Sequence, residues 1–515
     1  MTSDLSPIRS RCTRVASFVR GRAKIDREAG FIALGLTVFY VILVAPHMGR
    51  HLWFDELFTY YIAGEPGVAR LMDAIIRVDM NPPLSYFVVR WIQDLFGRSE
   101  IVTRLPFAVG FWAGSLGVFF SLRRRIGACW SAAAILLFWS SPYIRNASQA
   151  RPYGLLLAFF ALTLISFDHA GRVGRTRRSV FGIAAGNVGM MLSHVFAPLS
   201  ILPFCVAEAT RCIVRRRVDW PVWAALLLPV TISLAYLPAI RMYQHNYYPP
   251  AYQASGFSLL VFILRLVVFE MHRPLAIGSV LALVALPFSA KRAVGIRTGC
   301  PGLVWAAAFM AVPGILMMLL MRTGGAFGDR YCLTTALCFY VLVVAIMARV
   351  AGFRRSSALA AALTFAFFAL RQPYLADDAP PDAAELSMAG QQLPLVAASG
   401  LTFMEMDRYN ELQLQSRLYY LTDRNAAIRY AHATIFENMP LVKQVFPIHS
   451  NVSPYSTFVA SHRHFWVITR PAYLEDWLVR KLRDDGARLS LAASALGPTK
   501  DFLFYEVQWD GEQVR

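Results

Sequence analysis

Short clusters of arginine separate a series of apolar stretches between residues 31 and 370, and this alternation limits the fold more than any other feature. A helix of about 20 apolar residues crosses a bilayer, and basic residues favour the cytoplasmic side. Hydrophobic residues make up 56% of the chain and charged residues 16%. These proportions exclude an ordinary soluble enzyme, a disordered protein and a disulfide-rich secreted module. The sequence therefore predicts an α-helical polytopic membrane protein.

About eleven transmembrane helices account for the apolar stretches. With this count every basic cluster lies on the same side as the basic tail at 1–30, which we place in the cytoplasm. The net charge of +19 therefore reflects membrane topology, and we expect no nucleic-acid partner. A stretch at 257–271 contains two charged residues and reads as an interfacial or re-entrant helix. The predicted spans are 31–49, 105–122, 127–143, 152–167, 179–195, 196–213, 220–238, 274–290, 301–321, 331–348 and 356–370.

Two segments differ from the membrane part at 31–370. Residues 50–103 form a polar, extracytoplasmic loop with amphipathic stretches, and residues 371–515 carry 14 basic and 17 acidic residues. The second segment alternates helical stretches with short apolar runs, which predicts a C-terminal extracytoplasmic α/β domain. The runs that read as strands are PLVAAS, LYYLTD, HFWVITR, RLSLAAS and FLFYEV.

The first candidate for chemistry is an acidic pair, Asp55 and Glu56, directly after the first span. Carboxylates at the edge of an apolar bundle are costly unless they have partners. Asp55 could cap a helix by accepting backbone N–H groups, or it could act on a substrate. The residues alone leave both interpretations open.

Further polar residues lie at the same predicted membrane surface. In the Asp79–Pro83 segment the prolines end one helix and Leu84 begins the next, so a simple loop breaker is one interpretation. Arginines on this side run against the usual charge bias, and a fixed carboxylate or phosphate explains them best. These arginines are Arg104, Arg145, Arg151 and Arg330. The lone His194 fits a hydrogen-bonding role inside the bundle. No metal-ligand spacing is present, so we predict no metal site and no cofactor, although a divalent cation stays open.

Three segments together resemble the GT-C membrane glycosyltransferases: LWFDELFTYYIAG, DMNPPLSYFVVRWIQDLFGRSEIVTRLPFAV and SPYIRNASQARPYGLLLAFFALT. More narrowly, they resemble the group that contains protein O-mannosyltransferases, lipid A aminoarabinose transferases and the bacterial sugar transferases related to them. That group has an acidic pair after the first span, a D-x-H-P-P-L loop, an S-E…R-L-P segment and an R-P-Y at the fourth span. The resemblance covers residues 31–170 well, and His194 and the GDRY of 328–331 extend it more loosely.

The resemblance implies a GT-C fold and a polyprenyl-phosphate-linked sugar donor. It assigns catalysis to Asp55 and its neighbour Glu56. It places the donor phosphate near Arg104 and Arg151, with Arg330 as a third candidate. Asn81 stands where the family has histidine, which argues against an acid, base or metal-ligand role at that position. The remaining residues expected to line the substrate cavity are Asp79, Tyr153, His194 and Tyr331.

We therefore expect an integral membrane glycosyltransferase that moves a sugar to an extracytoplasmic acceptor with inversion, with Asp55 as the base. The acceptor would be a cell-envelope glycan, lipid or protein. Arginine far outnumbers lysine, which fits a GC-rich genome and a multi-pass protein of a bacterial inner membrane. Three alternatives remain: a lipid-linked oligosaccharide polymerase or ligase, a transporter or flippase for lipid-linked sugars, and a non-catalytic assembly protein.

Overall fold

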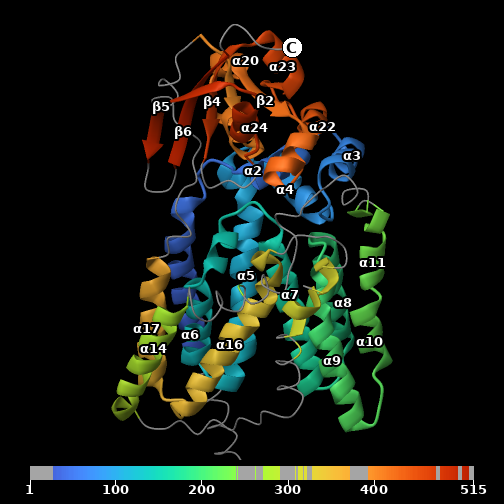
Figure 1. Cartoon of the computed structure of the whole chain (residues 1–515). Coiled ribbons are helices and arrows are strands. Elements are labelled where there is room, and N and C mark those ends of the chain that lie inside the picture. The colour runs from blue at the N-terminus through green and yellow to red at the C-terminus, as the bar shows by residue number, and fades with distance from the viewer. Residues whose placement is uncertain are drawn as a thin grey trace, which may run out of the picture.

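The computed structural model describes residues 27–238, 240–241, 261, 271–289, 308, 311–316, 318–321, 328–371, 392–470, 476–496 and 501–509. A bundle of long helices forms one part of the molecule, and a mixed β-sheet with short helices lies at one end of it (Figure 1). Three short helices from residues 50–103 lie between the bundle and the sheet.

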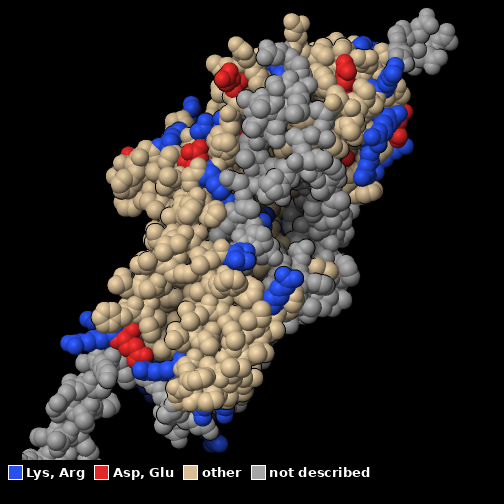
Figure 2. Space-filling view, turned by 90° about the vertical axis from the view of Figure 1, so that its left-hand side faces the viewer, with Lys and Arg blue, Asp and Glu red and all other residues tan. Residues whose placement is uncertain are grey.

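Long apolar helices dominate the bundle. Five of the described helices are long and apolar enough to cross a membrane: Arg27–His47, α5 (Glu100–Ile126), α7 (Tyr153–Arg172), α9 (Ala197–Arg215) and Arg330–Val350, which includes α16 (Leu333–Val350). The shorter helices are α6 (Ala128–Trp139), α8 (Arg177–Ser193), α10 (Trp220–Leu227), α11 (Val230–Leu234), α14 (His272–Val284) and α17 (Arg355–Leu370). On the face in Figure 2 a broad uncharged band covers much of the bundle. The chain is a multi-pass membrane protein.

The helices lie close to the predicted spans. Each predicted span contains helix in its described residues, although 301–321 is described only in part. The span predicted at 220–238 is instead divided into α10 and α11, where Pro229 cannot donate a backbone hydrogen bond. Most of the tail at 1–30 and of the predicted interfacial helix at 257–271 lies outside the described residues. The total of eleven spans therefore stays a prediction.

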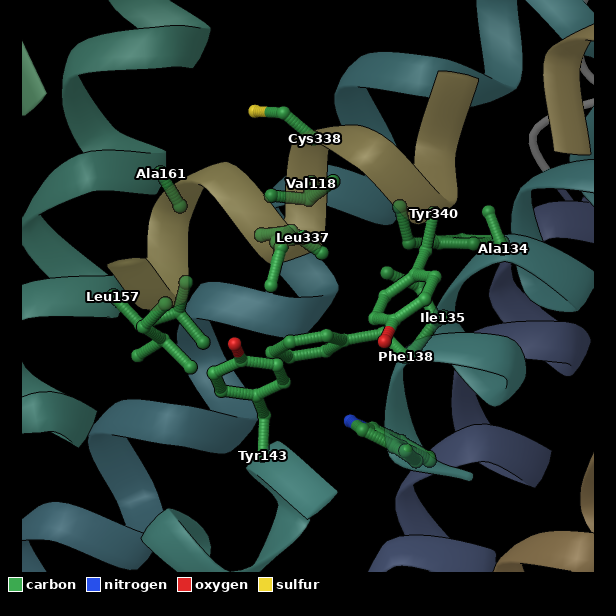
Figure 3. Packing of buried hydrophobic residues seen from close by; sticks show 14 of the residues in the cluster. Val118, Ala134, Ile135, Phe138, Tyr143, Leu157, Ala161, Leu337, Cys338 and Tyr340 are labelled. Atoms are coloured by element: carbon green, nitrogen blue, oxygen red, sulfur yellow. The ribbon is translucent and has the colours of Figure 1, made fainter. Parts of the chain in front are cut away.

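Small residues bring α5 and α7 together. A Cβ atom added at Gly154, near the start of α7, would lie 2.0 Å from the carbonyl oxygen of Phe107 on α5. Close approach through small residues is common between membrane helices. Elsewhere in the bundle, apolar side chains from α5, α6, α7 and α16 fill the main core, among them Val118, Phe138 and Leu337 (Figure 3). The start of α7 is therefore held firmly against α5.

Three amphipathic helices follow the first long helix: α2 (Phe54–Ala63), α3 (Val68–Val78) and α4 (Leu84–Phe96). Pro82 and Pro83 separate α3 from α4, as predicted. Leu57 and Leu71 share one hydrophobic cluster with Phe436 and other C-terminal residues. The apolar faces of these helices thus pack on the C-terminal part of the chain, and residues 50–103 are a folded unit.

The C-terminal part contains a six-stranded sheet in the order β3-β2-β1-β4-β6-β5. The first four strands in this order are parallel, and β6 and β5 are antiparallel to their neighbours. The strands are β1 (Leu395–Ala397), β2 (Leu418–Thr422), β3 (Asn451–Pro454), β4 (His464–Thr469), β5 (Arg488–Leu496) and β6 (Asp501–Gln508). The main helices between them are α19 (Gly400–Tyr409), α20 (Leu412–Arg417), α22 (Met439–Val445), α23 (Tyr455–Ser461) and α24 (Leu478–Asp484).

Each of the five runs predicted as strands contains a strand, and β3 is the strand that the sequence did not predict. β3 is short and polar, and it ends in Pro454. Such features are typical of an edge strand, which needs no apolar pattern on both faces. Along β1, Leu395 and Ala397 face the cluster shared with α2 and α3, whereas Val396 joins the cluster on the opposite face. This alternation gives the sheet two buried faces.

Candidate active site

The acidic pair lies in the first turn of α2, where the helix dipole favours negative charge. Trp53 occupies the N-cap position and Asp55 is the second residue of the helix. The interpretation of Asp55 as a helix N-cap is therefore wrong. Successive side chains on a helix point about 100° apart, so Asp55 and Glu56 enter different surroundings.

Glu56 forms a buried ion pair with Arg104, and both side chains are 1% exposed. The guanidinium donates from Nε to Oε1 at 2.8 Å and from Nη2 to Oε2 at 2.6 Å. The backbone N–H groups of Trp53 and Ala150 donate to the same carboxylate. Glu56 thus ties α2 to α5 and to the segment before α7.

The other N–H groups of Arg104 also have acceptors. Nη1 donates to the carbonyl oxygens of Met48 and Arg50, and Nη2 donates to that of His51. The prediction that Arg104 holds the donor phosphate does not fit these contacts, because its donors are already used. The Glu56 carboxylate is likewise enclosed by protein donors, so its expected catalytic role stays a prediction that these contacts do not favour. Arg104 and Glu56 thus form a buried pair next to Asp55.

Asp55 lies between two arginines that come from distant parts of the chain. Arg330 donates from Nη1 to Oδ2 of Asp55 at 3.1 Å. The Nε of Arg151 lies 3.8 Å from the same oxygen, and its Nη1 donates to the backbone carbonyl oxygen of Asp55 at 3.2 Å. The Asp55 side chain is 20% exposed. Both cations therefore contact one oxygen of a carboxylate that solvent can still reach.

Asp79 organises the loop between α3 and α4. Its Oδ1 accepts hydrogen bonds from the backbone N–H groups of Met80 and Asn81 and from Asn81 Nδ2, and its Oδ2 accepts from the Tyr86 hydroxyl at 2.6 Å. Burial and the Asp79 charge raise the pKa of Tyr86, so the phenol stays a donor. Arg151 Nη1 lies 3.7 Å from Asp79 Oδ2. Arg151 thus links Asp79 and Asp55.

The charge of Arg151 is secured by these two carboxylates. Burial lowers the pKa of Arg151, but Asp55 and Asp79 outweigh that effect and raise it overall. Its side chain is 11% exposed. A buried arginine of this kind can also donate charge-assisted hydrogen bonds to a bound anion such as a phosphate.

Aromatic residues extend from the arginines into the bundle. The ring of His194 lies 5.1 Å from that of Tyr153 and 6.0 Å from that of Tyr331. The Nδ1 atom of His194 accepts the backbone N–H of Phe196 at 3.1 Å, so its second nitrogen carries the proton in the neutral ring. The guanidinium of Arg330 lies 5.9 Å from the Tyr331 ring. The residues predicted to line the cavity are therefore contiguous.

Two buried N–H donors near Asp55 have no hydrogen-bond partner among the described residues: Arg151 Nε and Trp53 Nε1. The Trp53 ring lies 5.9 Å from the Arg330 guanidinium. Leaving a buried donor unpaired costs about 1–3 kcal/mol, so such groups often mark where a ligand binds. The sequence analysis did not predict Trp53 as a residue of the site, although Trp53 lies only two positions before Asp55.

The C-terminal part contributes a second contact that the sequence did not predict. The Tyr409 hydroxyl accepts the backbone N–H of Leu52 at 2.6 Å and donates to Glu100 Oε1 at 3.2 Å. Its ring stacks on His51 with 4.0 Å between centroids. Tyr409 thus holds the segment that leads into α2. Arg145, by contrast, is exposed and has no place in this cluster. Among the described residues no group of His, Cys, Asp and Glu has an arrangement that could hold a metal ion.

Comparisons with known proteins agree with this architecture. No protein-family profile matches the sequence, and no curated protein matches it. The structure is similar to that of ArnT from Cupriavidus metallidurans bound to undecaprenyl phosphate, with a TM-score of 0.51 and 14% identity over 93% of this chain and 98% of that chain. ArnT in the apo state gives a TM-score of 0.50 and 13% identity over 94% and 98% of the two chains. The arrangement of the helices agrees with that of ArnT, and the chain has the GT-C fold that the sequence led us to expect.

Proposed function

We propose that this protein transfers a sugar from a polyprenyl-phosphate donor to an acceptor on the extracytoplasmic side of a bacterial inner membrane. The observation that carries the proposal is the position of Asp55 between Arg151 and Arg330, beside buried N–H donors without partners. A neighbour in fold, ArnT, was crystallised with undecaprenyl phosphate, which supports the same class of lipid here. The acceptor would be a glycan, a lipid or a protein of the cell envelope.

Arg151 and Arg330 are the proposed ligands of the donor phosphate. The phosphate leaves as an anion, so it needs cations and no acid. Charge-assisted hydrogen bonds of this kind contribute about 1.5–3 kcal/mol each. A bound phosphate would compete with Asp55 for the two guanidinium groups and would offer acceptors to Arg151 Nε and Trp53 Nε1.

Asp55 is the proposed base for the acceptor hydroxyl. Both arginines contact its Oδ2, and we assign proton acceptance to Oδ1. Attack by the acceptor from the face opposite the phosphate would invert the anomeric carbon. Tyr153, His194 and Tyr331 would line the cavity for donor or acceptor, while Asp79 and Asn81 would fix the position of Arg151.

Substitution of Asp55 by asparagine tests this mechanism. Asp55→Asn keeps shape and hydrogen bonding but removes the base, so single-turnover transfer from the lipid-linked donor should fall by about 10²–10⁴-fold. Binding of undecaprenyl phosphate should survive in Asp55→Asn and weaken in Arg151→Gln. Asp73→Asn is the matched control, because Asp73 lies on α3 with its side chain 64% exposed.

The donor sugar can be found by mass spectrometry of envelope glycans from a strain that lacks the gene, with one sugar missing as the expected result. A purified protein that binds the donor and moves it across vesicles without transferring the sugar would favour a flippase instead. Near wild-type transfer by a folded Asp55→Asn variant would overturn the assignment of the base.

A further inference from the structure

A cavity of about 420 Å³ lies between the end of α9 and the start of α10. This turn is at the end of the bundle opposite the sheet and is therefore far from Asp55 (Figure 1). Four arginines and two carboxylates contribute to its lining, a net charge of +2. They are Arg175, Arg211, Arg215, Arg217, Glu208 and Asp219. The cavity belongs to no part of the site described above.

Local ion pairs use only part of this positive charge. Arg211 pairs with Glu208, and Arg175 pairs with Asp219 at 3.3 Å. Arg215 donates to the backbone carbonyl oxygen of Gly171 at 3.0 Å, so that contact neutralises no charge. Arg217 is exposed at the rim. The cavity therefore keeps an excess of cationic groups.

Arg211 shows that the cavity is more than a solvated cluster of charges. Its side chain is 11% exposed, and its guanidinium lies 4.8 Å from the ring of Phe167. Its Nε is buried and has no hydrogen-bond partner among the described residues. Arginines that merely mark the cytoplasmic side of a membrane protein need neither burial nor a cavity. An unpaired buried donor here points to an anionic ligand.

The rim of the cavity indicates where that ligand comes from. Trp220 lines the cavity and is 74% exposed, and Ile213 and Val214 on the last turn of α9 are 76% and 67% exposed. Exposed apolar side chains on a membrane helix face acyl chains, and tryptophan favours the level of the headgroups. The opening thus combines a cationic interior with an apolar, membrane-facing edge.

We propose that this cavity binds the phosphate of an anionic phospholipid headgroup. Arginine recognises phosphate through paired, charge-assisted hydrogen bonds, and basic pockets between membrane helices hold lipid headgroups. Free phosphate shares this chemistry, but it does not explain the apolar edge with Trp220. A lipid held here would link α9 to α10 from the side opposite the candidate active site. The proposal is independent of the sugar-transfer function.

Native mass spectrometry of the delipidated full-length protein in detergent tests the site. We expect the wild type to bind phosphatidylglycerol more tightly than phosphatidylcholine. The double variant Arg215→Gln/Arg217→Gln should weaken phosphatidylglycerol binding by about tenfold or more. The matched control is Arg177→Gln/Arg178→Gln, which makes the same change in charge at exposed positions at the start of α8. The control should bind like the wild type.

Inorganic phosphate is added as a competitor. Two results would overturn the proposal outright: equal binding of the two lipids, or equal losses of binding in the variant and the control. A third would be that inorganic phosphate displaces neither lipid and both lipids stay bound to the double variant. Inorganic phosphate binding as tightly as phosphatidylglycerol would assign the cavity to free phosphate and would also reject the lipid. If the double variant fails to fold, Arg217→Gln alone is compared with Arg177→Gln, because both side chains are exposed.

Discussion

Replacement of Glu56 by glutamine separates the two members of the acidic pair. The Glu56 carboxylate accepts four N–H groups: two from Arg104, one from Trp53 and one from Ala150. Glutamine keeps the size of the side chain but has one acceptor oxygen and no charge. Its amide group would face at least one N–H donor, and Arg104 would lose its counter-charge. We expect Glu56→Gln to destabilise the fold.

The size of the effect follows from burial. Loss of an ordinary hydrogen bond costs about 0.5–1.5 kcal/mol, whereas removal of one partner of a buried ion pair costs about 3–5 kcal/mol. Arg104 is 1% exposed, so water cannot replace the carboxylate. The carbonyl oxygens of Met48, Arg50 and His51 still accept its N–H groups but do not balance its charge. We therefore expect a loss of about 3 kcal/mol.

Reversible unfolding of the full-length protein in detergent measures this loss. Asp55→Asn is the internal control, because Asp55 is 20% exposed and Arg151 keeps a second carboxylate nearby in Asp79, so we expect a smaller loss than in Glu56→Gln. The double variant Glu56→Leu/Arg104→Met removes both charges and should recover part of the stability lost in Glu56→Gln. A loss below about 1 kcal/mol in Glu56→Gln, or equal losses at positions 55 and 56, would refute the division of roles.

Three further predictions concern other parts of the chain. Gly154→Ala should destabilise the bundle or block folding, because its Cβ would lie 2.0 Å from a backbone oxygen, whereas Gly35→Ala, with no atom within 4 Å, should be nearly neutral in the same unfolding assay. Burial raises the pKa of Glu437 from 4.5 to about 7, so the native state holds the proton more tightly than the unfolded chain. Its contribution to stability is full below about pH 4.5 and is lost as the pH rises through 7; Glu437→Gln should flatten this decline between pH 5 and 8, and the exposed Glu411→Gln should not. Reporter fusions after residues 75 and 450 should both be extracytoplasmic, and a cytoplasmic signal from either would contradict the topology.

Local patterns predicted the elements of the fold well. Hydropathy places a span within a few residues, and strands with apolar runs such as β2 and β4 are visible in the sequence. The division of 220–238 into α10 and α11 depends on a single residue, Pro229, inside an otherwise uniform apolar stretch. The short edge strand β3 carries no apolar pattern at all. The strand β3 depends on its pairing with β2, which a local window does not contain.

The sequence predicted which residues belong to the candidate site but not which carboxylate pairs with which arginine. The arginines predicted to lie on the non-cytoplasmic side were expected to face a fixed carboxylate or a phosphate, and the structure pairs Arg104, Arg151 and Arg330 with carboxylates. The sequence alone does not show these pairs, because the paired residues are up to 275 positions apart. The contact between Tyr409 and Leu52 spans 357 residues and has no sequence signature.

The buried pair explains how adjacent acids can do different work. Glu56 fixes the first turn of α2 through Arg104 on α5 and through Ala150, which is followed directly by Arg151. One side chain therefore sets the position of both Asp55, its neighbour in the helix, and Arg151, the cation beside Asp55. The distance between a carboxylate and an arginine is fixed only where the backbone at both residues is held rigidly, and a desolvated ion pair holds it here. On this reasoning a weakened Glu56–Arg104 pair should move Asp55 and Arg151 together, and donor binding should fall along with stability.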